Sequence, residues 1–400
     1  MIMPLIWALL AGLALVLGWA TGLPLFAWGG YLMLVLLLVG FLSTRLSYRG
    51  LTATRHLSVD RLRPGDRVEV MVRVENHSLL PAPWLVAAES LPVGLPMSGL
   101  RGRVVPLAGS RAFSFSYTLE GARRGYHQLG PTLLRTGDLF GLFHRQTAAG
   151  GSSWLTVYPK IVAVRQARLP SRRYLGELRT RQRVLEDPTQ VVGIRPYQRG
   201  DSLRRVHWRA TAHTGKLQSK LFELTAQPEV TLVLNLNRAD YPAHPDDAVE
   251  SAELAVTTAA SIAHHLLDRG QRVGLLALGR DPAEARVKRL PAVTPGRGRA
   301  QLIALLSLLG RVELGPSDPL VDVLAREKER FPWGTMVVVV TPKVEGDMVV
   351  GLLGLGAAGF GVQVILAGRT VSAPSRAEWG NIGVSASRVQ SEEDIRGLDL

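Results

Sequence analysis

The sequence predicts a multidomain chain in which a transmembrane helical hairpin, an antiparallel β-sandwich and an α/β doubly wound domain follow one another. Three observations lead to this fold class. Residues 1–44 carry no charged side chain, residues 57–158 alternate apolar with polar positions, and from residue 229 onward short apolar strands alternate with helical patterns. The predicted boundaries are 1–44 for the hairpin, 45–160 for the sandwich, 161–228 for a basic linker and 229–400 for the α/β domain.

The first 44 residues form two apolar stretches separated by Thr21-Gly22-Leu23-Pro24. We expect helices over about 5–20 and 25–42, each close to the roughly 17 to 25 residues that cross a bilayer. A cleaved signal peptide is the alternative. Such a peptide normally begins with basic residues and is not followed at once by a second, longer apolar span. The pattern therefore favours a membrane-spanning hairpin.

The charges that follow the second span predict its orientation. Positively charged flanks of membrane helices stay on the cytoplasmic side. The arginines of this flank are Arg45, Arg49, Arg55, Arg61 and Arg63. The chain has no cysteine, which excludes a disulfide framework and a thiol nucleophile and suits a reducing compartment. We expect a multi-pass protein of the cell membrane with its other domains in the cytoplasm.

Residues 57–158 are expected to form the sandwich. Val68, Val70, Val72 and Val74 recur at every second position, which is the period of a strand with one buried face. Turn-forming residues separate such runs, and no long helical period intervenes, so antiparallel sheets are the economical interpretation. The expected role of this domain is structural spacing.

The region from residue 229 alternates two kinds of element. Helical spacing is expected over about 247–268 and 298–309, with a further helix before the last strand. Uniformly apolar strands separated by helices are typical of a parallel sheet covered on both faces, with ligand sites at the carboxyl ends of the strands. The expected strands are 230–236, 272–278, 336–341 and 361–367.

Motifs for catalysis or cofactors are weak. Gly354-Leu-Gly356-Ala-Ala-Gly359 matches the dinucleotide pattern G-x-G-x-x-G, but it runs into a strand instead of following one, so it is interpreted as helix packing and capping. His264 and His265 are adjacent on a helix, about 100° apart, and do not share one metal ion unaided. Neither a phosphate-binding P-loop nor a nucleophile elbow occurs. We expect no cofactor and no enzymatic activity.

The net charge of +14 is concentrated in one segment. From Lys160 to Lys220 there are 15 Lys and Arg against 4 Asp and Glu, a net charge of +11. Such a field attracts acidic protein surfaces, anionic lipid and phosphates, and charge alone does not choose among them.

A short helix is expected inside this segment. Gly200-Asp201 predicts a turn, after which Leu203, Val206 and Ala210 would form a buried helix face, with Asp201 capping the helix start. The cations that would lie elsewhere on this helix are Arg204, Arg205 and Arg209, with Trp208 available for packing or a cation–π contact. Two interpretations stay open. The arginines either pair with acids of the α/β domain or form an exposed site for an anionic partner.

The segment resembles the signature of domain-of-unknown-function family 58. In that signature a tyrosine, a Gly-Asp turn, a basic pair, a tryptophan and a run of small residues with glycine follow in this order. The matching positions and their flanking arginines are Arg195, Tyr197, Gly200, Asp201, Arg204, Arg205, Trp208 and Arg209, and we expect them to bind a partner. A second stretch that these proteins commonly carry lies upstream, Gly137-Asp138-Leu139-Phe140-Gly141-Leu142-Phe143.

The resemblance implies a last domain similar to a von Willebrand factor type A fold, and genes placed beside those of MoxR-type AAA+ ATPases. In metal-binding relatives of that fold the first strand ends in D-x-S-x-S, which supplies oxygen ligands to a hard cation. The corresponding strand ends here in Asn235-Leu-Asn237-Arg238-Ala239, and a later one in Thr341-Pro342-Lys343. A degenerate site at Asn235, Asn237 and Thr341, without metal dependence, is therefore expected.

Three function classes follow. The first is a membrane-anchored, non-enzymatic adaptor or scaffold that docks a partner protein, a MoxR-type AAA+ ATPase, in envelope assembly or maturation. The second is binding of anionic lipid or nucleic acid through the basic segment, with lipid favoured because the chain is held at the bilayer and lacks a nucleic-acid fold motif. The third is an uncharacterised hydrolase or transferase that uses Asp201, His207 or His213.

Overall fold

The computed structural model describes residues 2–92, 94–165, 186–198, 201–224, 229–284, 290–332, 334–369 and 385–398. The chain divides into two compact units. The first comprises Met1–Lys160, Asp281–Val287 and Leu306–Glu313, and the second comprises Ile161–Arg280, Lys288–Leu305 and Leu314–Leu400.

Two apolar helices open the first unit, as the sequence predicts. α1 (Ile2–Thr21) and α2 (Pro24–Arg49) are joined by a turn in which Gly22 takes φ +69°, and Pro24 stands in the first turn of α2. Both helices are long and apolar enough to cross a membrane. Gly30 of α2 allows close approach to α1, because a Cβ there would lie 2.6 Å from the Leu15 side chain.

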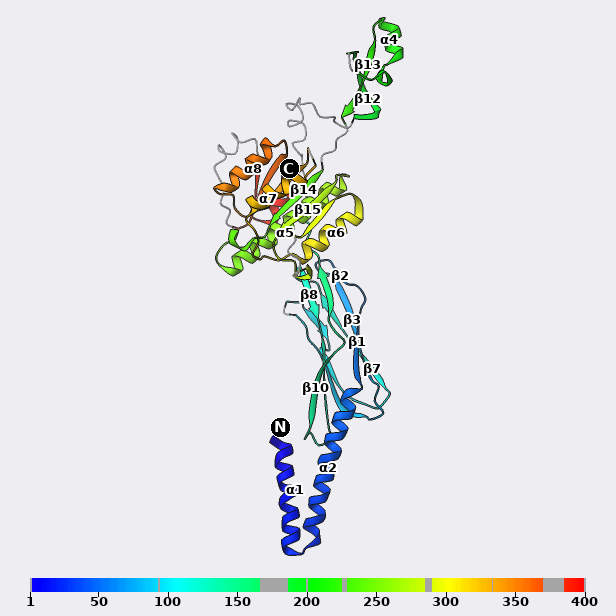
Figure 1. Cartoon of the computed structure of the whole chain (residues 1–400), viewed down its shortest axis with the longest axis vertical. Helices are drawn as coiled ribbons and strands as arrows, with labels where there is room; N and C mark the ends of the chain where they lie inside the picture. The colour runs from blue at the N-terminus through cyan, green and yellow to red at the C-terminus, as the bar shows by residue number, and fades with distance from the viewer. Residues whose placement is uncertain are drawn as a thin grey trace. The chain divides into compact units, whose positions relative to one another are not determined.

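α2 continues seven residues beyond the expected end at 42, and this extra length contacts the β part of the unit. Leu37, Gly40, Thr44 and Ser47 are buried, and their spacing of three and four residues places them on one face of the helix. The Ser47 hydroxyl donates a hydrogen bond to the Pro81 carbonyl at 2.9 Å. The helix therefore runs without a break from its apolar part to the base of the β domain (Figure 1).

Residues 51–157 form the predicted mostly β domain. One sheet has the order β1 (Leu51–Leu57), β3 (Arg67–Asn76), β7 (Ala112–Glu120), β5 (Met97–Gly99). Another has the order β10 (His144–Ala149), β9 (Thr132–Gly137), β4 (Ala82–Glu89), β6 (Gly102–Leu107). A small sheet contains β2 (Arg61–Leu62), β11 (Ser153–Val157) and β8 (Gly125–Leu129), and only its β2–β11 pair is parallel.

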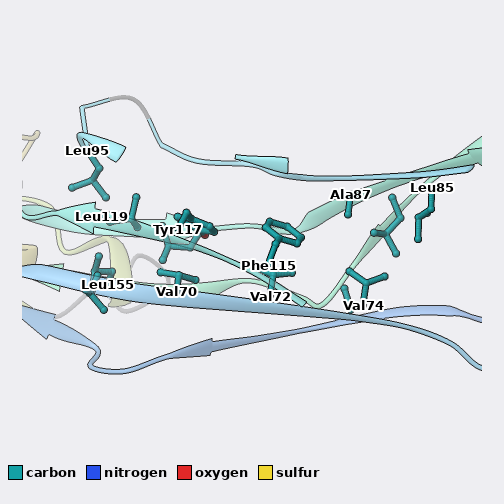
Figure 2. Packing of buried hydrophobic residues seen from close by; sticks show 14 of the residues in the cluster. Val70, Val72, Val74, Leu85, Ala87, Leu95, Phe115, Tyr117, Leu119 and Leu155 are labelled. Carbon is teal, nitrogen blue, oxygen red and sulfur yellow. The ribbon is translucent and has the colours of Figure 1, made fainter. Parts of the chain in front are cut away.

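The alternating valines of β3 point into one shared core. Val70 and Val72 of β3 pack in the same cluster as Leu85 and Ala87 of β4, so the two four-stranded sheets contribute to a single apolar interior (Figure 2). Phe115 and Tyr117 of β7 belong to the same core. The period-two pattern thus predicts the buried face correctly.

A charged pair is buried beside this core. The Arg55 and Glu89 side chains are 1% and 0% exposed, and the Arg55 guanidinium lies 2.8 Å from a Glu89 carboxylate oxygen. Arg55 also donates to the Leu129 carbonyl, and Glu89 accepts from the Thr132 and Tyr117 hydroxyls. Burial, and next the Glu89 charge, raise the pKa of Tyr117 well above its usual range. Every polar end of the pair thus has partners, which a buried ion pair requires.

The second unit contains a mixed six-stranded sheet of order β16-β15-β14-β17-β18-β19. β14 (Val230–Asn235), β15 (Val273–Leu278), β17 (Met336–Thr341), β18 (Gly361–Ala367) and β19 (Ser385–Val389) are parallel, whereas β16 (Ala292–Gly296) pairs antiparallel with β15. The four strands expected from the sequence are confirmed. The antiparallel edge strand β16 and the strand β19 were not expected.

Every residue of the central strands β14, β15 and β17 is buried, because helices cover the sheet. α7 (Leu320–Glu327) and α8 (Asp347–Ala357) share an apolar cluster with one set of strand residues, and α5 (Pro245–Asp268) packs against β14, β17 and β18. Further helices are α6 (Gly298–Arg311), α10 (Glu392–Arg396) and the short turn η4 (Lys328–Arg330), while the short turn η3 (Pro282–Glu284) belongs to the first unit.

Candidate functional site

Two regions hold the residues singled out in the sequence, and the first is the carboxyl edge of the six-stranded sheet. β14 and β17 are parallel neighbours, so their last residues, Asn235 and Thr341, lie side by side. Both residues are fully buried. The Asn235 amide nitrogen donates to the Thr341 hydroxyl at 3.1 Å. Asn237, the third expected residue, donates its backbone N–H to the Asn235 side chain at 3.0 Å, so the structure brings all three together around Asn235.

Asp240 is the edge residue that sequence reasoning missed. It lies in the short helical turn η2 (Arg238–Asp240). Its carboxylate accepts a hydrogen bond from the Asn235 amide at 2.8 Å, and the Lys343 ammonium lies 3.7 Å from its other oxygen. Its signal in the sequence is that it is the first acidic residue after β14. The edge thus holds one carboxylate between an amide and an ammonium group.

Asn237 organises the loops around this edge. Its side-chain oxygen accepts from the backbone N–H of Ala239 at 3.4 Å and of Ser317 at 3.3 Å, and its backbone forms an isolated parallel bridge with Gly315. Its own backbone N–H donates to the Asn235 side chain at 3.0 Å. Asn237 is therefore committed to holding two loops together.

The donor set of this edge is a poor fit for a divalent cation. Mg²⁺ and Ca²⁺ favour several carboxylate or carbonyl oxygens, whereas the one carboxylate here, Asp240, faces the Lys343 ammonium. The Thr341 hydroxyl donates to the Lys343 carbonyl at 3.0 Å. Within the described residues no group of three or more His, Cys, Asp and Glu side chains could hold a metal ion. Metal independence stays a prediction.

The second region is a hairpin built by the basic segment. β12 (Glu186–Pro196) and β13 (Gln218–Leu224) pair antiparallel, and the chain between them carries η1 (Leu203–Arg205) and α4 (Trp208–Thr214). We call residues 186–224 the basic hairpin. Within it, Gly200 and the side chain of Arg204, two of the expected binding residues, lie outside the described residues.

Asp201 organises the turn that follows β12. Its carboxylate accepts from the Gln198 backbone N–H at 3.1 Å and from the Arg195 guanidinium at 2.7 Å, while the Tyr197 hydroxyl donates to its carbonyl at 3.1 Å. The Gln198 hydrogen bond, and next the Arg195 contact, hold the pKa of Asp201 below its usual range. The expected role of Asp201 as a helix cap is wrong, because its carboxylate serves the preceding backbone.

The single helix expected over residues 203–210 is also wrong. The backbone is extended at Val206, with φ −62° and ψ 128°, and Val206 forms an antiparallel bridge with Ser219. The His207 N–H donates to the Gln218 carbonyl at 2.8 Å. Pairing with β13 therefore interrupts the helix, and Leu203 is left 65% exposed while Val206 is buried.

α4 is capped at both ends by local hydrogen bonds. The His207 ring Nδ1 accepts from the Ala210 backbone N–H at 3.1 Å, which makes His207 the N-cap. Gly215 takes φ +66° and ends the helix in the left-handed conformation that glycine adopts without strain. Both Asp201 and His207, considered above for catalysis, thus bind backbone groups. His213 lies exposed on α4.

The surface of the basic hairpin combines apolar and cationic side chains. Trp208 is 68% exposed, and Leu203 and Leu217 are exposed as well. Arg209 is exposed and Arg205 is half-buried. Exposed aromatic and aliphatic side chains among cations are typical of an interaction surface. These residues are therefore the best candidates for binding, among those the structure describes.

The two weak motifs lie on α8 and α5, and the expected packing role is wrong for Gly354 and Gly356, because a Cβ at either position would meet no atom within 4 Å. α8 ends at Ala357, and Gly359, with φ +90°, leads into β18, so the glycine pattern precedes a strand. His264 lies 3.2 Å from Asp268, four residues along α5. Burial lowers the pKa of His265.

Comparison with solved structures gives only partial similarities. The CARDB domain of PF1109 from Pyrococcus furiosus is 13% identical with a TM-score of 0.20, and covers 27% of this chain and 94% of that domain. Proximal thread matrix protein 1 from the mussel byssus is 11% identical with a TM-score of 0.30, and covers 43% of this chain and 46% of that protein. No fold assignment follows from values of this size.

The sequence comparisons are more informative. Uncharacterized protein YeaD of Bacillus subtilis (strain 168) is 25% identical over 238 residues, which is 58% of this chain and 57% of YeaD. The chain therefore aligns with somewhat more than half the length of this relative. The family described as "Protein of unknown function DUF58" matches residues 193–348, so the stretch that carries both the Asp201 turn and the Asn235–Asp240 edge is similar to that family.

Proposed function

We propose that this protein is a membrane-anchored, non-enzymatic adaptor whose basic hairpin docks an acidic surface of a partner protein. α1 and α2 provide the anchor. The observation that carries the proposal is the 68% exposure of Trp208 beside the exposed Arg209, on a hairpin that is held together by other residues.

Trp208 and Arg209 do not form the turn or the caps that hold the basic hairpin together. Asp201, His207 and Gly215 form the turn and caps, whereas the Trp208 and Arg209 side chains make no hydrogen bond or ion pair with another described residue. Tryptophan and arginine are the side chains that most often dominate protein–protein binding energy. A basic surface also speeds the encounter with an acidic partner.

A binding role fits the remaining chemistry better than catalysis. Asp201 and His207, the acid and base considered for a hydrolase, are engaged with backbone groups. At the sheet edge, the Asp240 carboxylate is held between Asn235 and Lys343. A general base must reach a substrate proton, and the contacts above hold these groups in the local fold.

The family resemblance supports one kind of partner. The resemblance implies genes placed beside those of MoxR-type AAA+ ATPases, so we propose such an ATPase as the partner and envelope assembly or maturation as the process. The parallel order of β14, β17 and β18, with the polar Asn235 and Thr341 at the carboxyl ends of β14 and β17, supports a von Willebrand factor type A-like domain.

The test is affinity capture of the detergent-solubilised full chain from its own cells. We expect the wild type to retain an AAA+ ATPase, and a Trp208→Ala, Arg209→Ala double variant to retain it at least about tenfold less. Arg103→Ala, an exposed arginine on β6, is the matched control and should capture as the wild type does. Equal capture by the double variant, with its thermal unfolding unchanged, would reject the hairpin as the docking surface.

Binding of anionic lipid is the second candidate, favoured by the net charge of +11 between Lys160 and Lys220. It predicts binding of the protein to vesicles rich in phosphatidylglycerol that is lost in high salt and in the double variant. Vesicle binding that changes neither in high salt nor in the double variant would exclude this candidate. Nucleic acid is a weaker alternative, and a DNA-binding assay under the same salt series tests it.

A further inference from the structure

The loop between β9 and β10 is a folded element that the proposed function does not use. Its centre is Asp138, which is buried. The Asp138 carboxylate accepts hydrogen bonds from the backbone N–H groups of Phe143 at 2.6 Å and Phe140 at 3.1 Å. The Trp84 indole N–H donates to the Asp138 carbonyl at 2.9 Å. The 137–143 stretch is therefore held in one conformation around a buried carboxylate.

This loop lies against α2. A Cβ on Gly40 would meet the Asp138 carboxylate and the Phe143 ring at 3.4 Å, so the helix backbone approaches the loop closely. The rings of Phe41 and Phe143 make an edge-to-face contact with centroids 5.7 Å apart. In Figure 1, β10 descends along the upper part of α2, in agreement with these contacts.

The tip of the loop presents two large apolar side chains outward. Leu139 is 79% exposed and Phe140 is 62% exposed, although both are adjacent to the buried Asp138. The hydrogen bonds of Asp138 prevent the tip from folding inward to cover them. Exposed apolar side chains on a rigid tip are typical of a surface that another phase or molecule covers.

The depth of the tip follows from its position along α2. At about 1.5 Å of rise per residue, the stretch from Pro24 to Phe41 is roughly 26 Å long, close to the roughly 30 Å of bilayer hydrocarbon. The first charge of the helix, Arg45, comes one turn later, and its guanidinium carbon lies 5.8 Å from the centre of the Phe41 ring. Gly40 and Phe41, which the loop contacts, thus lie where the hydrocarbon gives way to the headgroups.

We propose that Leu139 and Phe140 insert into the interfacial layer of the bilayer that α2 crosses, and so give the β domain its own contact with the membrane. The occupant of this apolar tip is the bilayer, because its loop contacts α2 at Gly40 and Phe41, where the apolar span ends. Aromatic and aliphatic side chains gain from that layer, and an arginine beside them reaches the headgroups. This inference rests on the proposed anchoring by α1 and α2.

Site-directed spin labelling tests the proposal, and the absence of native cysteine means that one introduced cysteine gives one label. The full chain carrying Phe140→Cys is labelled and reconstituted into vesicles of phosphatidylcholine and phosphatidylglycerol. Collision with oxygen, which concentrates in lipid, is compared with collision with a water-soluble nickel chelate. Thermal unfolding of the labelled chain confirms that the fold is kept.

Two further single-cysteine variants make the outcome decisive. Val59→Cys labels a half-exposed valine beyond the far end of β1, roughly 20 Å or more along the strand from Leu51. Val35→Cys labels the exposed middle of α2. We expect the oxygen-to-nickel ratio at 140 to exceed that at 59 and to fall between the values at 59 and 35.

The outcomes separate this inference from the proposal on which it rests. A label at 140 that matches the aqueous value at 59, while 35 is in lipid, overturns the insertion of the tip and leaves the anchor intact. A label at 35 that is also aqueous overturns the anchor itself. Protection of 140 from both reagents, with 35 in lipid, means that a protein covers the tip and likewise overturns the proposal.

Discussion

Two arginine–carboxylate pairs in this chain are built alike and used differently. In the β domain, the Arg55 and Glu89 side chains are 1% and 0% exposed. In the basic hairpin, the Arg195 and Asp201 side chains are 36% and 14% exposed. Arg55 spends its other donors on protein groups, including the Leu129 carbonyl and the Thr132 hydroxyl, whereas the guanidinium of Arg195 is partly in water.

The difference in exposure distinguishes charged groups that stabilise the fold from charged groups that are accessible to a binding partner. Removing a buried ion from water costs several kcal/mol, and only a complete set of partners offsets this cost. An exposed pair contributes about 0–1 kcal/mol, and its neighbours stay free to meet another molecule. The stability of the β domain should therefore depend strongly on its charged pair, and the stability of the hairpin weakly on its surface cations.

Glu89→Ala is the substitution with the largest expected effect. It leaves the Arg55 guanidinium buried without its carboxylate, so the free energy of unfolding of the β domain should fall by about 3–5 kcal/mol. Denaturant unfolding of the full chain in detergent measures this loss. An Arg55→Met, Glu89→Leu double variant, which removes both charges, should recover much of it. A Glu89→Ala protein as stable as the wild type would show that water or another group solvates Arg55.

Asn235→Asp tests a case between the two pairs. Asn235 is fully buried, yet the Asp240 and Lys343 that follow it are partly exposed, at 16% and 33%. The new carboxylate would lose the hydrogen bond donated to Asp240 and face a like charge, at a cost of about 2 kcal/mol.

Magnesium distinguishes the two forms of this edge. We expect added Mg²⁺ to raise the melting temperature of Asn235→Asp, because a second carboxylate makes the site attractive to a hard cation. The wild type should melt at the same temperature with Mg²⁺ and with EDTA. Stabilisation of the wild type by Mg²⁺ would contradict the prediction of metal independence.

Asp201→Asn should cost about 1–2 kcal/mol within the basic hairpin, because hydrogen bonds to a carboxylate are stronger than those to an amide. The pKa of Asp201 is lowered in the fold. Its contribution is therefore complete above the ordinary aspartate pKa of about 3.9 and is lost as the pH falls through the lower folded value. The protection factor of the Gln198 amide against hydrogen exchange should fall below that range in the wild type, and should be low and nearly independent of this titration in Asp201→Asn.

Trp208→Ala should have the smallest effect on stability, within about 0.5 kcal/mol, because most of the side chain is already in water. If the hairpin docks a partner, the same substitution should weaken capture clearly. Trp208→Ala should therefore lose partner capture while keeping its stability, whereas Glu89→Ala should lose stability. A large loss of stability would instead assign Trp208 a structural role.

The apolar elements of the fold could be predicted from the sequence because their patterns are local. The bounds of β17 and β18 are those expected, because most of their residues are apolar and buried. β19 was missed because most of its residues are polar and exposed. β16 was missed because Pro295 and Gly296 argue against a strand, and both are tolerated at a sheet edge.

The candidate sites were only partly predictable, because their contacts join distant residues. The meeting of Asn235 with Thr341 follows from the parallel order of two strands. The position of Asp240 depends on the η2 turn, which has no periodic signal. The residues from Leu203 to Ala210 have helical spacing, but Val206 pairs instead with Ser219, thirteen residues away, and this pairing interrupts the helix.

The unbroken course of α2 makes the anchor a torsional element as well as a tether. One helix carries both Gly30, which packs on α1, and Gly40 and Ser47, which contact the β domain, so the angle between these contacts around the helix axis is fixed. One residue inserted between Leu37 and Gly40 would turn the hairpin by about 100° relative to the β domain, whereas an insertion of about a full turn would nearly restore the phase. An insertion in this part of α2 should therefore keep the native arrangement only when its length is close to a whole number of helical turns.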